Sequence, residues 1–378
     1  MKIMIGADLS PTPLNFSLFE NGDVNALLGK ELVHLLGSVE YRIFNLERPL
    51  TDTESPIVKW GPCLSAPSRT IEAIKKMDVT LFTMANNHIM DQGENGLKDT
   101  CRLLSQNGID YVGAGKNLSE ALKAHILEKD GIKVGIYACA EHEFSIAEDA
   151  KPGANPFDPL ESTDHIAELK EQCDYVIVLY HGGKEHYRYP SPMLQKTCRK
   201  LVDKGADIIL TQHSHCIGAM EYYNEKVILY GQGNFLFAAK NMDECWNSGL
   251  LVELQIDKSG IKTYFHPIVR EGLGVRIATD EERKQILTAF EERSKEITEK
   301  EKVLEKYNAY ADKMFIGYES AMLGNIGKSF LFCALNKLSG YRLIRKIFSG
   351  MSMVALRNAM ECEAHYELLV SGCRNRIR

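Results

Sequence analysis

Two histidines stand one residue apart in the segment Gln212-His213-Ser214-His215. The apolar run 206–210 precedes them, so we expect the segment to be a loop at the carboxyl end of a strand. On extended backbone, residues i and i+2 point the same way, and both rings can then reach one small volume. Neutral imidazole is a common ligand of zinc, iron and similar ions, so this spacing favours metal binding. For this pair alone, two neighbouring surface histidines are the other interpretation.

Metal-competent side chains also follow the other apolar segments that read as strands. They are Asp8, Glu47, Asn87 with His88, and His181. In α/β folds the residues beyond the carboxyl ends of strands line the active crevice. A structural hydrogen bond would explain any one of these residues, whereas their succession along the chain favours a functional site.

The candidate ligands offer oxygen and nitrogen atoms and no thiolate, a set that suits Mn²⁺, Fe²⁺ or Zn²⁺. Asp8, Glu47, Asn87, His181 and the His213/His215 pair are too many for one tetrahedral ion. They suit two divalent ions that share a carboxylate, which would activate a water and neutralise a phosphoryl or carbonyl oxygen.

A leaving group also needs a proton. His88, next to Asn87, is placed to give it, and Asp91, three residues further on, can orient its imidazole.

Expected strands alternate with expected helices along the part of the chain that positions these residues, and this alternation predicts an α/β domain. A hairpin of 250–256 with 261–269 hints at a second sheet packed against the first. The expected strands are 2–6, 39–45, 79–85, 111–112, 132–138, 174–180, 206–210 and 227–230, and the expected helices are 25–36, 68–77, 96–106, 118–125, 164–172 and 194–204.

Beyond about residue 270 the sequence pattern predicts helices only. Thr279 and Glu282 form a capping box that opens a helix to about residue 302, and further helical patterns cover 330–348 and 353–369. We therefore expect a catalytic domain over 1–270 and a helical region over 271–378 that serves packing or dimerisation.

Composition narrows the classes of partner. The net charge of −6 comes without a basic stripe, which argues against nucleic acid. The 10 cysteines are scattered without a Cys-x-x-Cys pair, as in proteins of a reducing compartment. With no signal-peptide core and no apolar run of about 18 residues, we expect a cytoplasmic protein without a membrane span. The sequence leaves the oligomeric state open.

Several short motifs stand in order along residues 1–269. They are Asn45-Leu46-Glu47, Ala85-Asn86-Asn87-His88 with Asp91 and Gly93, Gly113-Ala114-Gly115, His181-Gly182-Gly183, His213-Ser214-His215 and Gly233-Asn234-Phe235. Together they resemble the CapA family of bacterial poly-γ-glutamate capsule-biosynthesis proteins, which is itself similar to calcineurin-like metallophosphoesterases.

The resemblance implies a four-layer α/β/β/α sandwich with a two-metal site. By position, Asp8 and His215 would bind the first metal, Glu47 would bridge, and Asn87, His181 and His213 would bind the second, with His88 as the catalytic acid. Such phosphoesterases usually carry Asp-x-His at the first strand, whereas this chain has Asp8-Leu9-Ser10.

Four further residues are candidates for substrate binding. His142 and Glu143 end a strand, and a hydrogen-bonded pair at the rim is the other interpretation. Glu185 and Arg188 follow His181, and Arg188 suits bidentate recognition of a carboxylate, unless both are solvated loop residues.

The leading hypothesis is a metal-dependent hydrolase that cleaves a phosphoester or a γ-glutamyl-type amide in an anionic polymer or a phosphorylated small substrate. The alternative, motivated by Ser10, is a metal-binding accessory factor without catalysis in polyglutamate or polysaccharide assembly.

Overall fold

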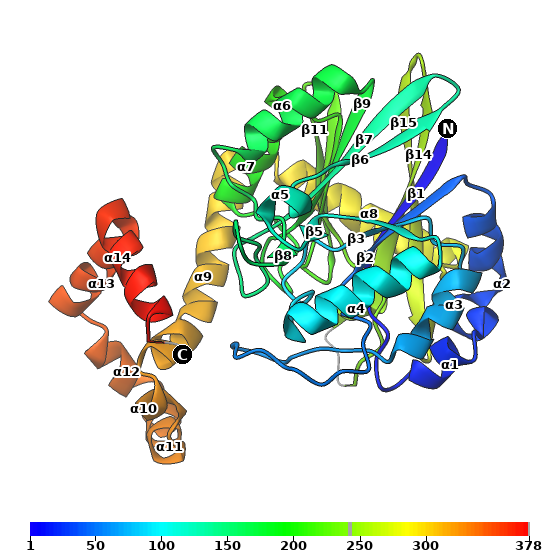
Figure 1. Ribbon diagram of the computed structural model, residues 1–378. Coiled ribbons are helices and arrows are strands. Elements are labelled where there is room, and N and C mark those ends of the chain that lie inside the picture. The colour runs from blue at the N-terminus through cyan, green and yellow to red at the C-terminus, as the bar shows by residue number, and fades with distance from the viewer. Residues whose placement is uncertain (241–243, 377–378) are drawn as a thin grey trace. The chain divides into compact units, whose positions relative to one another are not determined.

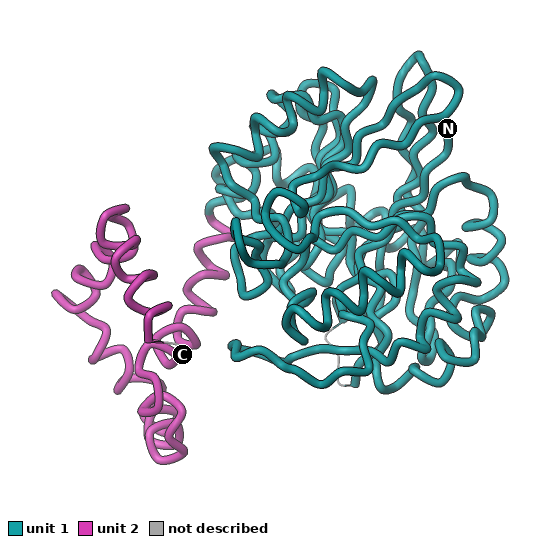
Figure 2. Tube along the Cα trace, in the orientation of Figure 1, with its two compact units in different colours: residues 1–304 teal, residues 305–378 magenta. Residues whose placement is uncertain are grey.

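The computed structural model describes residues 1–240 and 244–376. It divides into two compact units, Met1–Leu304 and Glu305–Arg378 (Figure 2). The first unit contains both large sheets, and the second is helical (Figure 1).

The first large sheet has a parallel part and an antiparallel part. Its strand order is β16-β15-β14-β1-β2-β3-β4, and β13 (Asn234–Leu236) also pairs with β1. The parallel strands are β1 (Lys2–Leu9), β2 (Tyr41–Leu46), β3 (Leu81–Thr83) and β4 (Asp110–Val112), and the antiparallel ones are β14 (Ser248–Asp257), β15 (Gly260–Glu271) and β16 (Gly274–Ile277). The predicted hairpin is therefore confirmed as β14 and β15. It does not belong to a second sheet, as its position had hinted, because β14 pairs with β1 and the hairpin extends the first sheet.

The second large sheet has the order β11-β12-β10-β9-β7-β6. Its four central strands are parallel, and antiparallel strands form both edges. The strands are β6 (His125–Lys129), β7 (Ile132–Ala140), β9 (Tyr175–His181), β10 (Ile208–Gln212), β11 (Ile217–Tyr223) and β12 (Lys226–Gln232). A small pair, β5 (Ala114–Gly115) with β8 (Gly153–Ala154), stands apart.

The two sheets pack face to face, and helices cover their outer faces. Alternate residues of β1 show this: Ile3 and Ile5 join the core between the sheets, whereas Met4 joins the core under the helices. Helices α1 (Phe16–Glu20), α2 (Val24–Gly37), α3 (Ile71–Lys76) and α4 (Gly93–Gln106) cover the first sheet, and α6 (Ser162–Gln172) and α7 (Pro192–Asp203) cover the second. The α/β/β/α sandwich is thus confirmed.

One expected helix is largely wrong. The segment 118–125 forms only the short α5 (Leu118–Ala121), and His125 already begins β6. This strand pairs with β7 in antiparallel fashion and buries Leu127 in the core between the sheets, so sheet pairing overrides the local helical spacing.

The C-terminal helices are more broken than their patterns predict. The expected 330–348 helix divides into α11 (Phe330–Leu338) and α12 (Arg342–Ile347), because Gly340 and Tyr341 both have a φ of 63°. The expected 353–369 helix divides into α13 (Met351–Glu361) and α14 (Glu363–Arg374). The predicted capping box at Thr279 is confirmed at the start of α8 (Asp280–Glu296).

Helix α8 packs on β11 and β15 and belongs to the first unit, and α9 (Lys300–Met322) passes from the first unit to the second. The predicted domain boundary at 270/271 stays a prediction. Among the described helices, none is both long and apolar enough to span a bilayer.

Candidate metal centre

The candidate residues meet because parallel register aligns the carboxyl ends of their strands. In the first sheet Asp8 is paired with Asn45, two residues before Glu47. In the second sheet His181 is paired with Gln212, one residue before His213. Both sheets therefore deliver their polar residues to one end of the sandwich.

Two groups of three side chains are close enough to hold metal ions. One is Glu47 with His181 and His213, and the other is Asp8 with Glu47 and His215. Within each group, one ligand atom from every residue lies within 4.8 Å of the others. All of these residues are buried, and Glu47 belongs to both groups, as a bridging carboxylate would.

Two amide side chains complete this arrangement. The Asn87 Oδ1 lies 3.1 Å from the His181 Nε2, which puts its carbonyl beside the second group. The Asn45 Nδ2 donates a 2.8 Å hydrogen bond to Asp8 Oδ1 and thereby fixes one oxygen of that carboxylate. Asn45 was not singled out in the sequence, although it lies in one of the motifs.

The unpaired polar atoms of the cluster fit a cation. Both Glu47 carboxylate oxygens, the Asp8 Oδ2 and the His213 Nδ1 are buried without a hydrogen-bond partner in the described part of the chain. Burying such atoms unsatisfied is costly, and all of them are lone-pair donors to metals. The residues present therefore fit divalent ions.

The electrostatics of the cluster point the same way. Burial and the neighbouring Asp8 raise the pKa of Glu47 well above its usual value. Burial also lowers the pKa of His181 and of His213 well below the ordinary value. Burial alone would lower the pKa of His215 too, but Glu47 and Asp8 outweigh it and raise that pKa to about 9. A cation would stabilise the ionised carboxylates that burial disfavours.

The backbone of the two paired histidines differs from the expected one. His213 has a φ of 90° and His215 a φ of 54°, so neither is extended. Strand β10 ends at Gln212, and these left-handed conformations then direct the two rings into the separate groups. Such backbone in residues other than glycine is uncommon and concentrates at functional sites.

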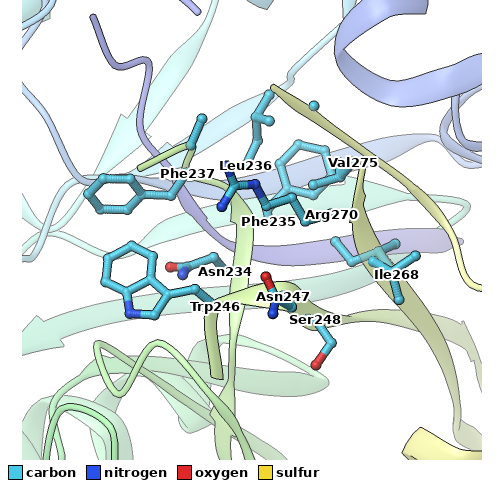
Figure 3. A pocket seen from close by; sticks show the side chains of 14 residues that line it. Asn234, Phe235, Leu236, Phe237, Trp246, Asn247, Ser248, Ile268, Arg270 and Val275 are labelled. Atoms are coloured by element: carbon cyan, nitrogen blue, oxygen red, sulfur yellow. The ribbon is translucent and has the colours of Figure 1, made fainter. Parts of the chain in front are cut away.

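Aromatic side chains and an amide hold the His215 ring. Trp246 stacks on it with a centroid distance of 4.3 Å, and Phe237 meets it edge-on at 5.7 Å. The Asn234 Oδ1 lies 2.9 Å from the His215 Nδ1. These three neighbours are seen together in Figure 3 at a small pocket beside β13. Trp246 was missed because it is distant in sequence and carries no motif.

His88, the predicted catalytic acid, is in contact with Asp91, the residue predicted to orient it. The His88 Nδ1 lies 2.6 Å from the Asp91 Oδ2, which also accepts a 2.7 Å hydrogen bond from the Leu64 backbone N–H. The sequence did not indicate the third member, Lys59, whose side chain is only 2% exposed and whose Nζ is 2.6 Å from the Asp91 Oδ1. The same ammonium lies 3.4 Å from the His88 Nδ1.

The guanidinium of Arg48 is hydrogen-bonded to Ser10, the residue at which the family resemblance led us to expect a histidine. The Arg48 Nε donates to the Ser10 Oγ at 3.0 Å, and its Nη1 donates to the Ser65 carbonyl at 2.9 Å. Burial lowers the pKa of Arg48 to about 10, against the opposing effect of the adjacent Glu47. A buried cation therefore lies beside Glu47, and sequence reasoning missed this cation.

The four substrate-binding candidates lie in different surroundings. Glu143 Oε2 accepts a 3.2 Å hydrogen bond from Asn87, and Glu185 Oε1 is 4.0 Å from the His213 Nε2, so both border the centre. His142 is exposed. The Arg188 Nη1 donates a 3.1 Å hydrogen bond to the Ile217 carbonyl, and its Nη2 lies 3.6 Å from the Glu244 Oε1. Their substrate-binding roles stay predictions.

Sequence comparisons relate this chain to bacterial capsule synthesis proteins. The family model of the bacterial capsule synthesis protein PGA_cap matches residues 15–239, which include all of the candidate ligands except Asp8. The chain is 33% identical over 203 residues to the PGA biosynthesis protein CapA of Bacillus subtilis, covering 52% of each chain. It is also 33% identical over 180 residues to the capsule biosynthesis protein CapA of Bacillus anthracis, covering 46% of this chain and 44% of that one.

The chain thus spans about half the length of these curated relatives. Among solved structures, the NAD nucleotidase of Haemophilus influenzae aligns with 83% of this chain and 60% of its own, with a TM-score of 0.40 and 15% identity. The family match alone covers more than half of the chain. The chain therefore belongs to the PGA_cap family of bacterial capsule synthesis proteins.

Proposed function

We propose that this chain is a metal-dependent hydrolase that uses two divalent ions to cleave a phosphoester or a γ-glutamyl-type amide. The observation that carries the proposal is Glu47, which is shared by two groups of buried candidate ligands and whose two oxygens have no hydrogen-bond partner in the described part of the chain. Mn²⁺, Fe²⁺ and Zn²⁺ all match a set of imidazoles and carboxylates.

The proposed ligands follow the two groups of side chains. Asp8, Glu47 and His215 would hold the first ion, and Glu47, His181 and His213, joined by Asn87, would hold the second. Ions bound there would activate water and neutralise charge on the group under attack.

The chain's own residues would supply the proton that the leaving group needs. Because Asp91 binds the Nδ1 of His88, the Nε2 is the ring atom left to donate a proton to the leaving group. Asp91 stabilises the protonated ring, and Lys59 keeps Asp91 in place through its own ion pair. His88 is the proposed catalytic acid, and Asp91 and Lys59 are positioning residues.

An anionic polymer or a phosphorylated small molecule is the proposed substrate class. The relatives are named as PGA and capsule biosynthesis proteins, which supports a polymer. The buried guanidinium of Arg48 beside Glu47 supports an anionic group at the centre.

The test is to measure bound metal and hydrolysis on the same samples. Wild-type protein purified without chelator is analysed for metal and assayed with bis(p-nitrophenyl) phosphate and γ-glutamyl p-nitroanilide. His181→Ala and His213→Ala should lose bound metal and turnover, whereas His34→Ala, which removes an exposed imidazole from α2, should keep both. Unchanged turnover in His181→Ala and His213→Ala would contradict the proposal.

A second candidate function is a metal-binding accessory factor without catalysis. The contact between Ser10 and Arg48 favours it, because an imidazole ligand is missing and a fixed positive charge lies beside the first ion's site. This function requires one metal ion per chain and no hydrolysis of either substrate after metal has been supplied.

A further inference from the structure

The second unit differs from the first in the kind of side chain it exposes. Most of the exposed large apolar side chains of the described chain fall within its 305–376 portion. Helix α11 shows the pattern best: Leu331, Leu335 and Leu338 follow i, i+4 and i+7 spacing on one helical face and are 67%, 48% and 84% exposed. Asn336 of the same helix is buried, with its Oδ1 accepting the Ile344 N–H at 3.2 Å. The helix thus buries an amide and exposes its leucines.

The charged side chains in the middle of the second unit are all basic. Between Glu319 and Glu361 there are six lysines and arginines and no acidic residue. Helix α12, which contacts α11, carries Arg342, Arg345 and Lys346. None of these three forms an ion pair within 4.0 Å in the part of the chain that the structure describes. The whole protein, by contrast, has a net charge of −6.

We propose that the segment 330–347, made of α11 and α12, binds the surface of an anionic phospholipid bilayer. Exposed leucines next to unpaired basic residues are the composition of helices that lie in the membrane interface. The leucines would enter the boundary of the acyl chains while the basic side chains meet lipid phosphates. The proposal is independent of the hydrolase function.

The basic charge and the exposed leucines of this segment together favour an anionic bilayer over a second copy of the chain or a nucleic acid. A second copy of the chain would bring one basic segment against another, which is repulsive. Nucleic acid would account for the basic residues and leave the exposed leucines unexplained. An anionic bilayer matches both features.

The test is co-sedimentation of the full chain with vesicles of phosphatidylglycerol and phosphatidylcholine, compared with phosphatidylcholine alone. The wild type should sediment with the anionic vesicles and be released by salt, because the attraction is screened. The triple variant Arg342→Glu/Arg345→Glu/Lys346→Glu should bind them at least about tenfold more weakly. The variant Leu331→Ser/Leu335→Ser/Leu338→Ser should also bind more weakly.

A matched control reverses three exposed lysines of the first unit, Lys30→Glu/Lys196→Glu/Lys200→Glu, and should bind like the wild type. Circular dichroism verifies that all variants are folded. The proposal is overturned if the wild type stays in the supernatant, if the control loses binding equally, or if the leucine variant binds like the wild type. Self-association of the wild type that the leucine substitutions abolish, without vesicle binding, would also overturn it.

Discussion

Glu47 is the residue on which the candidate centre depends. Its carboxylate is buried next to Asp8, and the cost of that burial is visible in its raised pKa. The candidate ligands could be picked out from the sequence because each lies at the end of an apolar segment that reads as a strand. Lys59 could not, because its segment carries no periodic pattern, and Arg48, although it directly follows Glu47, was missed because its contact with Ser10 joins segments that are distant in sequence.

The bridging role of Glu47 can be tested through stability. Added Mn²⁺ or Zn²⁺ at about 100 times its Kd should stabilise the wild type by about 2.7 kcal/mol for each ion bound, because only the folded chain assembles the ligands. Glu47→Gln keeps the shape of the side chain and removes its charge, so metal should no longer raise its melting temperature. Glu31→Gln, an exposed change on α2, is the control and should respond like the wild type. Equal metal shifts in all three proteins would contradict the bridging role.

The group of His88, Asp91 and Lys59 can be tested through kinetics. His88→Gln should lower kcat by about 10²–10⁴-fold, the usual contribution of a general acid, while bound metal stays unchanged. Lys59→Met should lower kcat less and leave KM nearly unchanged, because Lys59 contacts Asp91 and not the substrate in this account. Lys30→Met is the surface control. A rise in KM alone for Lys59→Met would instead place the ammonium on the substrate.

At the scale of elements, the sequence pattern predicted most of the strands, whereas their division into two sheets came from the family resemblance. Local signals failed where pairing partners are distant in sequence. The segment after Ala121 became β6 because β7 was available to pair with it, which local spacing does not reveal. The left-handed backbone of His213 and His215 was also missed, because positive φ is uncommon in any residue other than glycine and the sequence does not locate it.

The ladder between β11 and β12 supports the loop that carries both histidines, and Gly218 is its tightest point. A Cβ at Gly218 would stand 1.4 Å from the Tyr230 carbonyl oxygen, so Gly218→Ala must separate the strands. We expect a loss of about 3 kcal/mol or more in unfolding free energy, measured by urea denaturation. Gly37→Ala at the end of α2, where a Cβ meets nothing within 4 Å, should be neutral or slightly stabilising. Equal stability of the two variants would refute this packing.

At the scale of the whole molecule, the sequence predicted a sandwich followed by helices but did not locate where packing on the sandwich ends. Phe290 of α8 joins the core between the sheets, and Ile297 and Val303 join the core of the second sheet. These contacts link distant parts of the chain, so helical periodicity alone gives no sign of them.

Two truncations test how far the packed unit extends. A chain ending at Leu304 should keep a cooperative thermal transition close to that of the full protein. A chain ending at Arg270 lacks β16 and α8 and exposes apolar core surface, at a cost of about 1.5–3 kcal/mol for each fully buried side chain. It should unfold at a clearly lower temperature. A truncation at Arg270 that is as stable as the one at Leu304 would place the boundary where the sequence predicted it.

The central claim is that the cluster around Glu47 makes this chain a metal-dependent hydrolase. The most direct measurement is turnover of the phosphodiester and γ-glutamyl substrates by chelator-treated protein as divalent metal is restored stepwise, with bound metal determined at every step. The account predicts that hydrolysis of at least one substrate is absent in the stripped protein and rises as the centre fills toward two ions per chain. Protein that is fully loaded with metal and hydrolyses neither substrate would contradict it and favour the accessory factor.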